Sequence, residues 1–349
     1  MGNFLISDYE KVFCKVKSKK GEKMGKIKLL SILGMIILLF TGCLSESDRA
    51  ERVLQKHLKD RYGEEFVIYG MGKRAGNVRR WYEAAVVYPK SYIGTRKEND
   101  SYYWGKGFVE LNDGMKGGDT YGGVLLNESA NEVYGKKLKE LFGENYLAVI
   151  DVKGTYSYRD FEEEMKKRKK SYDRNPAGIY SPISGGIYIF GRVENDEDRE
   201  WYRKQIYEFI QFMKETGTFE YVDLGVIVWD ERVLSDEFRE NKKLRNEIIA
   251  ARNTYKDNKE FIKIRKKLMS KTNKSAENLT NKEKKEILDN YNRSQMYGEN
   301  NNVDKILAYN ELLGIKIYSP KYIESQGLYH RKKSNYAKIE DIEYWNEIY

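Results

Sequence analysis

The chain has 349 residues, of which 40% are hydrophobic, 34% charged and 13% aromatic, with four Pro and two Cys. This apolar content can fill a sizeable core, so the composition excludes wholesale disorder as well as collagen-like and disulfide-rich chains. At roughly 100–200 residues per domain, the length allows two domains or one large domain.

The N-terminal part carries the pattern of an export signal. Lys26 and Lys28 precede an uncharged stretch, 29–41, made mostly of Leu, Ile and Met. At about 1.5 Å per residue, a helix over this stretch measures about 20 Å, which is shorter than the ~30 Å hydrocarbon core of a bilayer. The pattern therefore predicts a signal peptide over residues 1–42 rather than a membrane-spanning helix.

The stretch ends in Leu39-Phe40-Thr41-Gly42-Cys43, which resembles the lipobox of bacterial lipoproteins. In that pattern an apolar residue and two small residues precede the lipidated cysteine, and Phe40 stands here where Leu is usual. The resemblance implies that Cys43 receives a diacylglyceryl group and that signal peptidase II cleaves before it. Fatty acyl chains such as palmitate would then anchor the protein in the bacterial cell envelope, with its globular part outside the cytoplasm.

The cysteines also limit the chemistry of the chain. Residues 1–23 precede a second start-like residue, Met24, and we interpret them as a start-site artefact or an unusually long n-region. Cys14 lies there, so the processed chain keeps Cys43 alone, without an intrachain disulfide or a Cys-ligated metal. The chain holds no HExxH, phosphate-loop or nucleophile-elbow motif, and we expect no cofactor, no metal and no catalytic residue.

The formal net charge of +9 is uneven along the chain. Residues 1–42 hold eight Lys and three acidic residues, which leaves +4 for the processed chain, whereas 241–298 hold 16 basic and 7 acidic residues. This basic region is either a solvated helical face or a surface for anionic lipid headgroups or acidic envelope polymers. Nucleic acid is not expected as a partner of an exported lipoprotein.

The processed chain is expected to begin with a helix and two strands. The helix covers 48–61 and opens with a capping box from Asp48, and the strands cover 66–69 and 81–88. Glycine-rich residues 102–126 predict hairpins and a mobile loop.

Two later segments share a pattern of strand, helix and strand. In the first, strands 124–126 and 146–152 flank a helix capped by Ser129; in the second, strands 187–190 and 221–229 flank helix 196–215. The pattern predicts a mixed sheet with flanking helices and a possible duplication. With the Gly185-Gly186 pair before the second unit, these features resemble a family of uncharacterised lipoproteins from low-GC bacteria.

The fold class expected is therefore α+β, followed by a helical C-terminal region. Helices are expected at 161–172, 235–254, 259–270, 280–291 and 303–313, the fourth with a capping box from Thr280 to Glu283. The division expected is signal peptide 1–42, lipid tether 43–47, α+β domain 48–235, basic helical region 236–314, and short strand with aromatic tail 315–349.

Carboxylates and aromatic clusters are the candidate functional groups. Asp151 and the pair Asp230-Glu231 follow the ends of corresponding strands. These carboxylates are either ordinary solvated residues or an acid and base pair for glycoside hydrolysis. Glycoside hydrolysis requires the two carboxylates to lie about 5–10 Å apart. Three clusters could stack on sugar rings, form a protein interface or fill the core, namely Trp81-Tyr82, Tyr102-Tyr103-Trp104 and Tyr156-Ser-Tyr158. His57, on the apolar stripe of the first helix, is expected to pack in the core.

The short tether completes the functional prediction. Leu44 to Ser47 span at most about 14 Å when extended, so the folded body stays close to the bilayer. The sequence therefore predicts a membrane-tethered envelope lipoprotein that acts as a non-enzymatic binding or assembly module. The alternatives are an envelope glycan hydrolase using Asp151 with Asp230 or Glu231, and an accessory or immunity-type lipoprotein that binds one protein partner.

Overall fold

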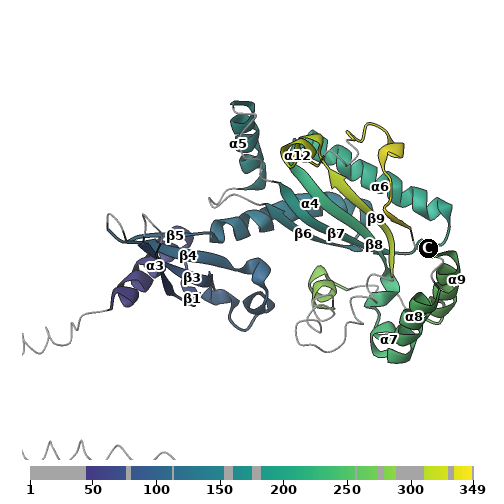
Figure 1. Ribbon diagram of the computed structural model, residues 1–349, viewed down its shortest axis with the longest axis horizontal. Helices are drawn as coiled ribbons and strands as arrows, with labels where there is room; N and C mark the ends of the chain where they lie inside the picture. Colours follow the sequence, from purple (N-terminus) through teal and green to yellow (C-terminus); the bar gives the residue numbers. More distant parts are fainter. Residues whose placement is uncertain are drawn as a thin grey trace, which may run out of the picture.

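The computed structural model describes residues 45–75, 80–111, 114–152, 160–174, 182–255, 258–272, 279–287, 310–328 and 334–347. It confirms an α+β fold with a mixed sheet, flanking helices and further helices in the C-terminal region. Two units lie at opposite ends of the molecule and are joined by the helix α4 (Figure 1). The predicted signal peptide and Cys43 lie outside the described residues.

The first unit opens with α3 (Glu46–Tyr62), which starts two residues earlier than predicted. Ser45 is the N-cap: its hydroxyl accepts the N–H of Asp48, and the Asp48 carboxylate accepts the N–H of Ser45, each at 3.1 Å. The capping box exists, but Asp48 is its acidic partner and not its first residue. Gly63 ends the helix with a left-handed φ of 78°.

An antiparallel sheet follows, with strand order β1-β3-β4-β5 and β2 also paired to β3. Its strands are β1 (Phe66–Tyr69), β2 (Gly72–Ala75), β3 (Arg80–Pro89), β4 (Gly105–Glu110) and β5 (Lys116–Asp119). Between β3 and β4 the chain forms three short 3-10 helices: η1 (Lys90–Tyr92), η2 (Arg96–Asn99) and η3 (Ser101–Tyr103). β2 was not expected because Gly and Lys are depleted in strands; pairing with β3 holds it there.

The core of the first unit lies between α3 and one face of this sheet. It consists of Ala50, Leu54, Leu58, Phe66, Tyr82, Ala84, Val87, Val109, Tyr121 and Val124. Gly107 lets β4 pass directly under α3, since a Cβ there would lie 2.6 Å from Leu54 Cδ2. The helix and sheet therefore pack without a gap.

A buried carboxylate ties α3 to the end of this sheet. Asp119 accepts hydrogen bonds from Tyr62 Oη at 2.6 Å and Arg61 Nη1 at 3.0 Å, and lies 2.8 Å from His57 Nε2. His57 was expected to pack as a core residue; it is instead half-buried and a hydrogen-bond partner of Asp119. The carboxylate also accepts the N–H of Tyr121 at 2.8 Å, where the next helix begins.

α4 (Tyr121–Phe142) links the two cores. Tyr121 and Val124 belong to the first core, whereas Tyr134 and Leu138 belong to the second. The strand predicted at 124–126 is wrong, because these residues lie in the first turns of α4. Burial of this turn outweighs the weak helix propensity of its two glycines. Ser129, predicted as a helix cap, also lies within α4, and its hydroxyl accepts the N–H of Phe161.

The second unit is built on a mixed sheet with strand order β10-β9-β8-β7-β6. Its strands are β6 (Tyr146–Val152), β7 (Ile183–Gly191), β8 (Val222–Asp230), β9 (Glu311–Tyr318) and β10 (Asn346–Glu347). β7 and β8 are parallel, and their connection is α6 (Asp196–Glu215) followed by η4 (Phe219–Tyr221). The duplication is not found, because the first of the two expected units begins with a helix.

Helices cover both faces of this sheet. α4, α5 (Phe161–Arg174) and α6 supply the core of one face. The opposite face packs against α7 (Asp236–Glu240), α8 (Lys242–Thr254), α9 (Asn258–Met269) and the helical segment 281–287, which follow η5 (Glu231–Leu234). The helix expected at 235–254 is thus two helices, with Asn241 capping the second. The Thr280–Glu283 capping box is confirmed.

The chain returns to the sheet after the helices. β9 begins at Glu311, inside the range 303–313 that was predicted to be helical and before the strand predicted at 315. Its residues alternate between the core and the opposite face while pairing with β8. α12 (Pro320–Ser325), η6 (Ile339–Asp341) and β10 follow, so the range 315–349 contributes strands to the same sheet as 146–230.

Candidate functional site

The two expected acidic positions do not converge. Asp151 pairs with Ser184 at the start of β7, whereas Asp230 pairs with Gly191 at its end. Seven residues of strand separate these positions, which corresponds to about 23 Å. The proposed glycoside hydrolase pair of Asp151 with Asp230 or Glu231 is therefore contradicted. Because β6 runs antiparallel to β8, the carboxyl ends of these two strands lie at opposite ends of the sheet.

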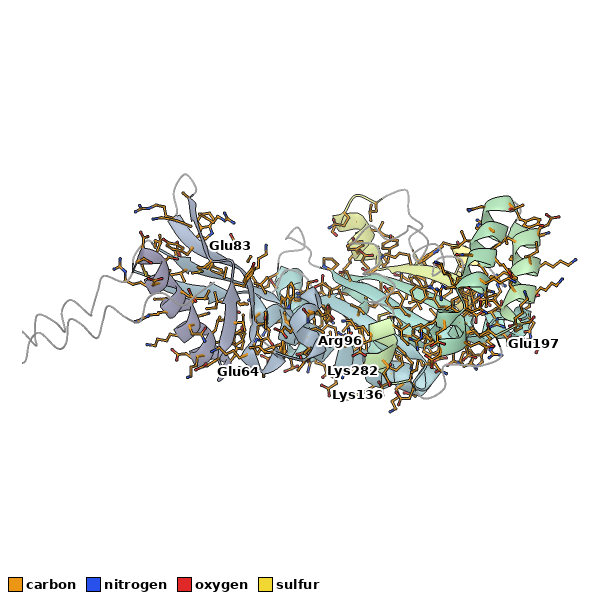
Figure 2. All side chains as sticks on the ribbon, turned by 90° about the horizontal axis from the view of Figure 1, so that it is seen from below. Glu64, Glu83, Arg96, Lys136, Glu197 and Lys282 are labelled. Carbon is orange, nitrogen blue, oxygen red and sulfur yellow. The ribbon has the colours of Figure 1, made fainter. Side chains whose placement is uncertain are left out.

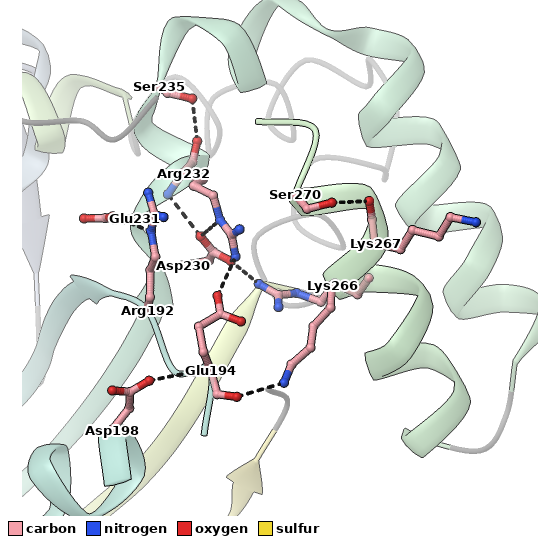
Figure 3. Close-up of polar contacts among 11 residues, drawn as sticks. Arg192, Glu194, Asp198, Asp230, Glu231, Arg232, Ser235, Lys266, Lys267 and Ser270 are labelled. Carbon is pink, nitrogen blue, oxygen red and sulfur yellow. Dashed lines mark hydrogen bonds and ion pairs between the residues drawn. The ribbon is translucent and has the colours of Figure 1, made fainter. Parts of the chain in front are cut away.

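Asp230 instead forms the centre of a buried ion cluster (Figure 3). Its oxygens accept hydrogen bonds from Arg232 Nε at 2.7 Å, Arg232 Nη2 at 2.6 Å and Arg265 Nη2 at 2.6 Å. Burial raises the pKa of Asp230, but the two guanidinium groups outweigh it and hold the pKa below its ordinary value. The cluster fastens α9 to the end of β8, which is a structural role.

Glu231 points elsewhere. Its carboxylate accepts a hydrogen bond from Arg192 Nε at 2.7 Å, on the side of the strand end away from the cluster. Neither acidic residue of the Asp230-Glu231 pair is therefore placed to act on a ligand together with Asp151.

A cavity of about 840 Å³, here called the junction hollow, lies where the two units meet. It is lined by residues of η1 to η3, α4, β6 and the segment 281–287, and Figure 2 labels Arg96 and Lys282 there. The ring of Tyr103 lies between two ammonium groups, Lys97 Nζ at 4.8 Å and Lys285 Nζ at 4.9 Å from its centroid. Such cation–π contacts hold the loops of the first unit against the second.

Two lysines of the junction hollow are paired with carboxylates within the protein. Lys97 Nζ donates to Glu128 at 2.6 Å, and Lys285 Nζ donates to Asp100 at 2.6 Å. Burial opposes the charge of Lys97, but the hydrogen bond and charge of Glu128 outweigh it and raise the pKa of Lys97. The contacts around this hollow therefore hold the two units together, and we call the contacts of Lys285 with Asp100, Tyr102 and Tyr103 the clasp.

A second cavity of about 710 Å³, here called the floor hollow, lies over the sheet of the second unit. Its floor includes Asp151, Ser184, Gly186, Asp223 and Lys316, which come from four neighbouring strands. Its walls include Trp104 and Tyr102 of the first unit and Tyr188 of β7. Polar groups and aromatic rings thus converge on one space between the units, which is the usual character of a ligand site.

The aromatic clusters noted in the sequence lie in different parts of the structure. Tyr102 and Tyr103 line the junction hollow, and Trp104 lines the floor hollow. Tyr82 is buried in the first core, whereas Trp81 faces away from it; Tyr156 and Tyr158 lie outside the described residues. The sequence did not point to Asp223 or Lys316, because each reads as an ordinary polar residue within an alternating strand.

The described residues also bear on metal binding and on membrane crossing. They contain no group of three or more His, Cys, Asp or Glu side chains placed to hold a metal ion. Within the same part of the chain, every helix is too short or too polar to cross a membrane.

Comparison with known proteins adds a distant likeness. No known family model matches the chain, and no curated protein matches it. The crystal structure of a DUF5037 family protein from Ruminococcus gnavus ATCC 29149, at 2.55 Å resolution, aligns at 17% identity with a TM-score of 0.32. The alignment covers 55% of this chain and 78% of that chain. This score is too low to support an argument about fold or function.

Proposed function

We propose that this chain is a lipid-anchored lipoprotein of the bacterial cell envelope that acts as a non-enzymatic binding module. The observation that carries the proposal is the lipobox-like sequence Leu39–Cys43 directly after the uncharged stretch 29–41. An export signal of this length ends where the lipidated cysteine is required. The fold supports the proposal because α3 starts so soon after that cysteine.

The start of α3 shortens the tether. Only Leu44 and Ser45 separate Cys43 from Glu46, the first residue of the helix. Three residue steps span at most about 10 Å. A lipid on Cys43 would therefore hold the first unit directly at the membrane surface, without the long leader that would let the body project away from it.

The binding role is supported by the space between the units. The floor hollow joins aromatic and polar side chains from both units. The paired carboxylates that a glycan hydrolase would need are at opposite ends of the sheet. A binding module accounts for both observations.

The basic helices bear on the orientation of the anchored molecule. α8 and α9 lie at the end of the molecule away from α3 (Figure 1). Part of the basic excess also serves the interior, because Arg265, Lys284 and Lys285 are buried. We therefore propose that the first unit faces the bilayer and that the basic helices stand away from anionic headgroups.

Mass spectrometry of the protein purified from bacterial membranes tests the anchor. We expect the N-terminal peptide to begin at Cys43 and to carry the mass of a diacylglyceryl group. The Cys43→Ser variant should keep residues 1–42 and lose the lipid, whereas the matched Cys14→Ser variant should be processed like the wild type. A wild-type protein without acyl mass would contradict the proposal.

A second candidate function is an accessory lipoprotein that binds one protein partner. The observation that favours it is the outer face of the first sheet, where Tyr69 is 71% and Phe108 40% exposed. Phe108 and Trp81 also border a hollow of about 350 Å³ there. A photo-crosslinking residue at position 108 should then capture one protein from intact cells, and the same residue at Trp201 should not. Equal capture at both positions argues against this candidate.

A further inference from the structure

The sheet face opposite α4 and α6 changes character along its length. Under α8 and α9 it is apolar, with Leu147, Phe190 and Trp229 packed against the helices. Toward the first unit the same face carries Asp151, Ser184, Asp223 and Lys316. No described helix covers this half of the face, which lines the floor hollow, so polar side chains there are available to a ligand.

The register places the polar side chains in one row. Asp151 pairs with Ser184, and Ser184 pairs with Asp223, so the two carboxylates project from the same face two strands apart. Their backbones are therefore about 9–10 Å apart. Lys316 Nζ lies 2.7 Å from Asp223 Oδ1, which places a donor beside the acceptors.

Glycine leaves open space on the same sheet face, beside the residues of this row. Gly225 lies between Gly186 and Lys316 in the register, two residues from Asp223 on the same face. A Cβ at Gly225 would meet only Gly185 O, at 3.8 Å. A central strand normally carries Val or Ile here, and its absence leaves room for a ligand to approach the backbone.

The wall of the hollow includes the aromatic ring of Trp104. The indole N–H of Trp104 is buried and has no hydrogen-bond partner among the described residues. The Trp104 ring stacks on Tyr88 with centroids 6.3 Å apart, which fixes its orientation. Because this N–H is covered by the protein itself, Trp104 offers its ring, and not its N–H, to a molecule in the hollow.

We propose that the floor hollow binds a saccharide. Its floor offers a donor, Lys316, and two acceptors, Asp151 and Asp223. Hydroxyl groups both donate and accept, so a polyhydroxylated ring can satisfy both kinds of group at once. The apolar face of such a ring packs on an aromatic side chain, as Trp104 provides. This inference rests on the proposed binding function, but it does not require the lipid anchor.

The test is a glycan array probed with the purified full chain in a detergent that carries no sugar headgroup. Oligosaccharides that bind are then titrated by calorimetry against three variants. Trp104→Ala and Asp151→Asn should weaken binding by about ten-fold or more. Gly225→Val should abolish binding while keeping the fold, because its side chain enters open space in a strand, where Val is favoured.

Two controls separate the site from general effects. Asp236→Asn and Trp345→Ala change the same residue types outside the hollow and should bind like the wild type. Cys43→Ser should also bind unchanged, so loss of the anchor and loss of the saccharide site are distinguishable. The proposal is overturned if no saccharide on the array binds, or if Gly225→Val folds and binds as tightly as the wild type.

Discussion

Asp230 shows what a single buried carboxylate does in this protein. Arg232 comes from the next turn of chain, but Arg265 reaches it from α9, 35 residues further on. The carboxylate is fully buried and Arg265 is 2% exposed, so neither charge is solvated. A pair of this kind adds little net stability over apolar packing, yet breaking it leaves charges without compensation.

Asp230→Asn should therefore destabilise the protein by about 3–5 kcal/mol, because two buried guanidinium groups lose their counter-charge. The free energy of unfolding from urea denaturation measures the effect. Glu231→Gln is the matched control: its partner Arg192 is 40% exposed, and loss of that ion pair should cost about 1 kcal/mol or less. Equal losses in the two variants would show that the cluster is not a structural centre.

The same carboxylate predicts how stability depends on pH. Burial raises the pKa of Asp230. Hydrogen bonds and charge from Arg232 and Arg265 outweigh burial and hold this pKa below its ordinary value of about 3.9. A depressed pKa contributes stability above the unfolded-state pKa, and the contribution disappears as pH falls through the native pKa. Urea denaturation between about pH 5 and pH 2 should show this loss, and the Asp230→Asn variant should show a smaller loss.

At the scale of elements, α4 protects the edge of the second sheet. β6 is the last strand, so some of its N–H groups lack a strand partner. Asn127 Oδ1 accepts the N–H of Val152 at 2.8 Å, and Asn131 Oδ1 accepts the N–H of Ile150 at 3.1 Å. Two residues one helical turn apart thus cover an edge that could otherwise pair with another chain.

Asn127→Ala should cost about 1–3 kcal/mol, because the buried N–H of Val152 loses its acceptor. Chemical denaturation measures the loss, and hydrogen exchange at Val152 should become faster. Lys136→Ala on the exposed side of α4 is the control, with an expected change within about 0.5 kcal/mol. If both variants are equally stable, water replaces the amide and the edge is not protected by Asn127.

The segment 281–287 fastens the helical insertion to the first unit. Lys285 bonds Asp100 and lies over the rings of Tyr102 and Tyr103. Lys285→Ala should therefore increase hydrogen exchange in 281–287 and in η3, since both lose the same contacts. Lys282→Ala, on the exposed side of the segment, should leave exchange unchanged. An unchanged pattern in Lys285→Ala would contradict the clasp.

Local signals predicted the elements that depend on local interactions. α6, the Thr280 box and the strands β6 and β8 follow from periodicity and caps near their own residues. α4 and β9 were predicted wrongly at their starts, because burial of Tyr121 and pairing of Leu313 with Val228 are set by distant residues. Tertiary contacts override local propensity at both places.

At the scale of the whole molecule, the candidate site depends on how the two units meet. The sequence drew attention to Trp104 as part of an aromatic cluster, but not to the row formed by Asp151, Asp223 and Lys316. That row requires the order of four strands, which follows from one parallel and two antiparallel pairings. The same order separates Asp151 from Asp230, so knowledge of topology was needed both to reject one site and to recognise the other.

The elongated shape makes the anchoring geometry testable. A fluorescent label on Lys56→Cys in α3 should transfer energy to acceptor lipids much more efficiently than a label on Glu197→Cys, which Figure 2 places in the second unit, away from α3. If Cys43 carries the proposed lipid, the span of about 10 Å between Cys43 and α3 keeps the first label at the surface. Vesicles with and without anionic lipid should give the same result, because the proposed orientation keeps the basic helices away from the headgroups. Equal transfer from both labels on anionic vesicles alone would instead mean that the charge of α8 and α9 draws the molecule down along the bilayer.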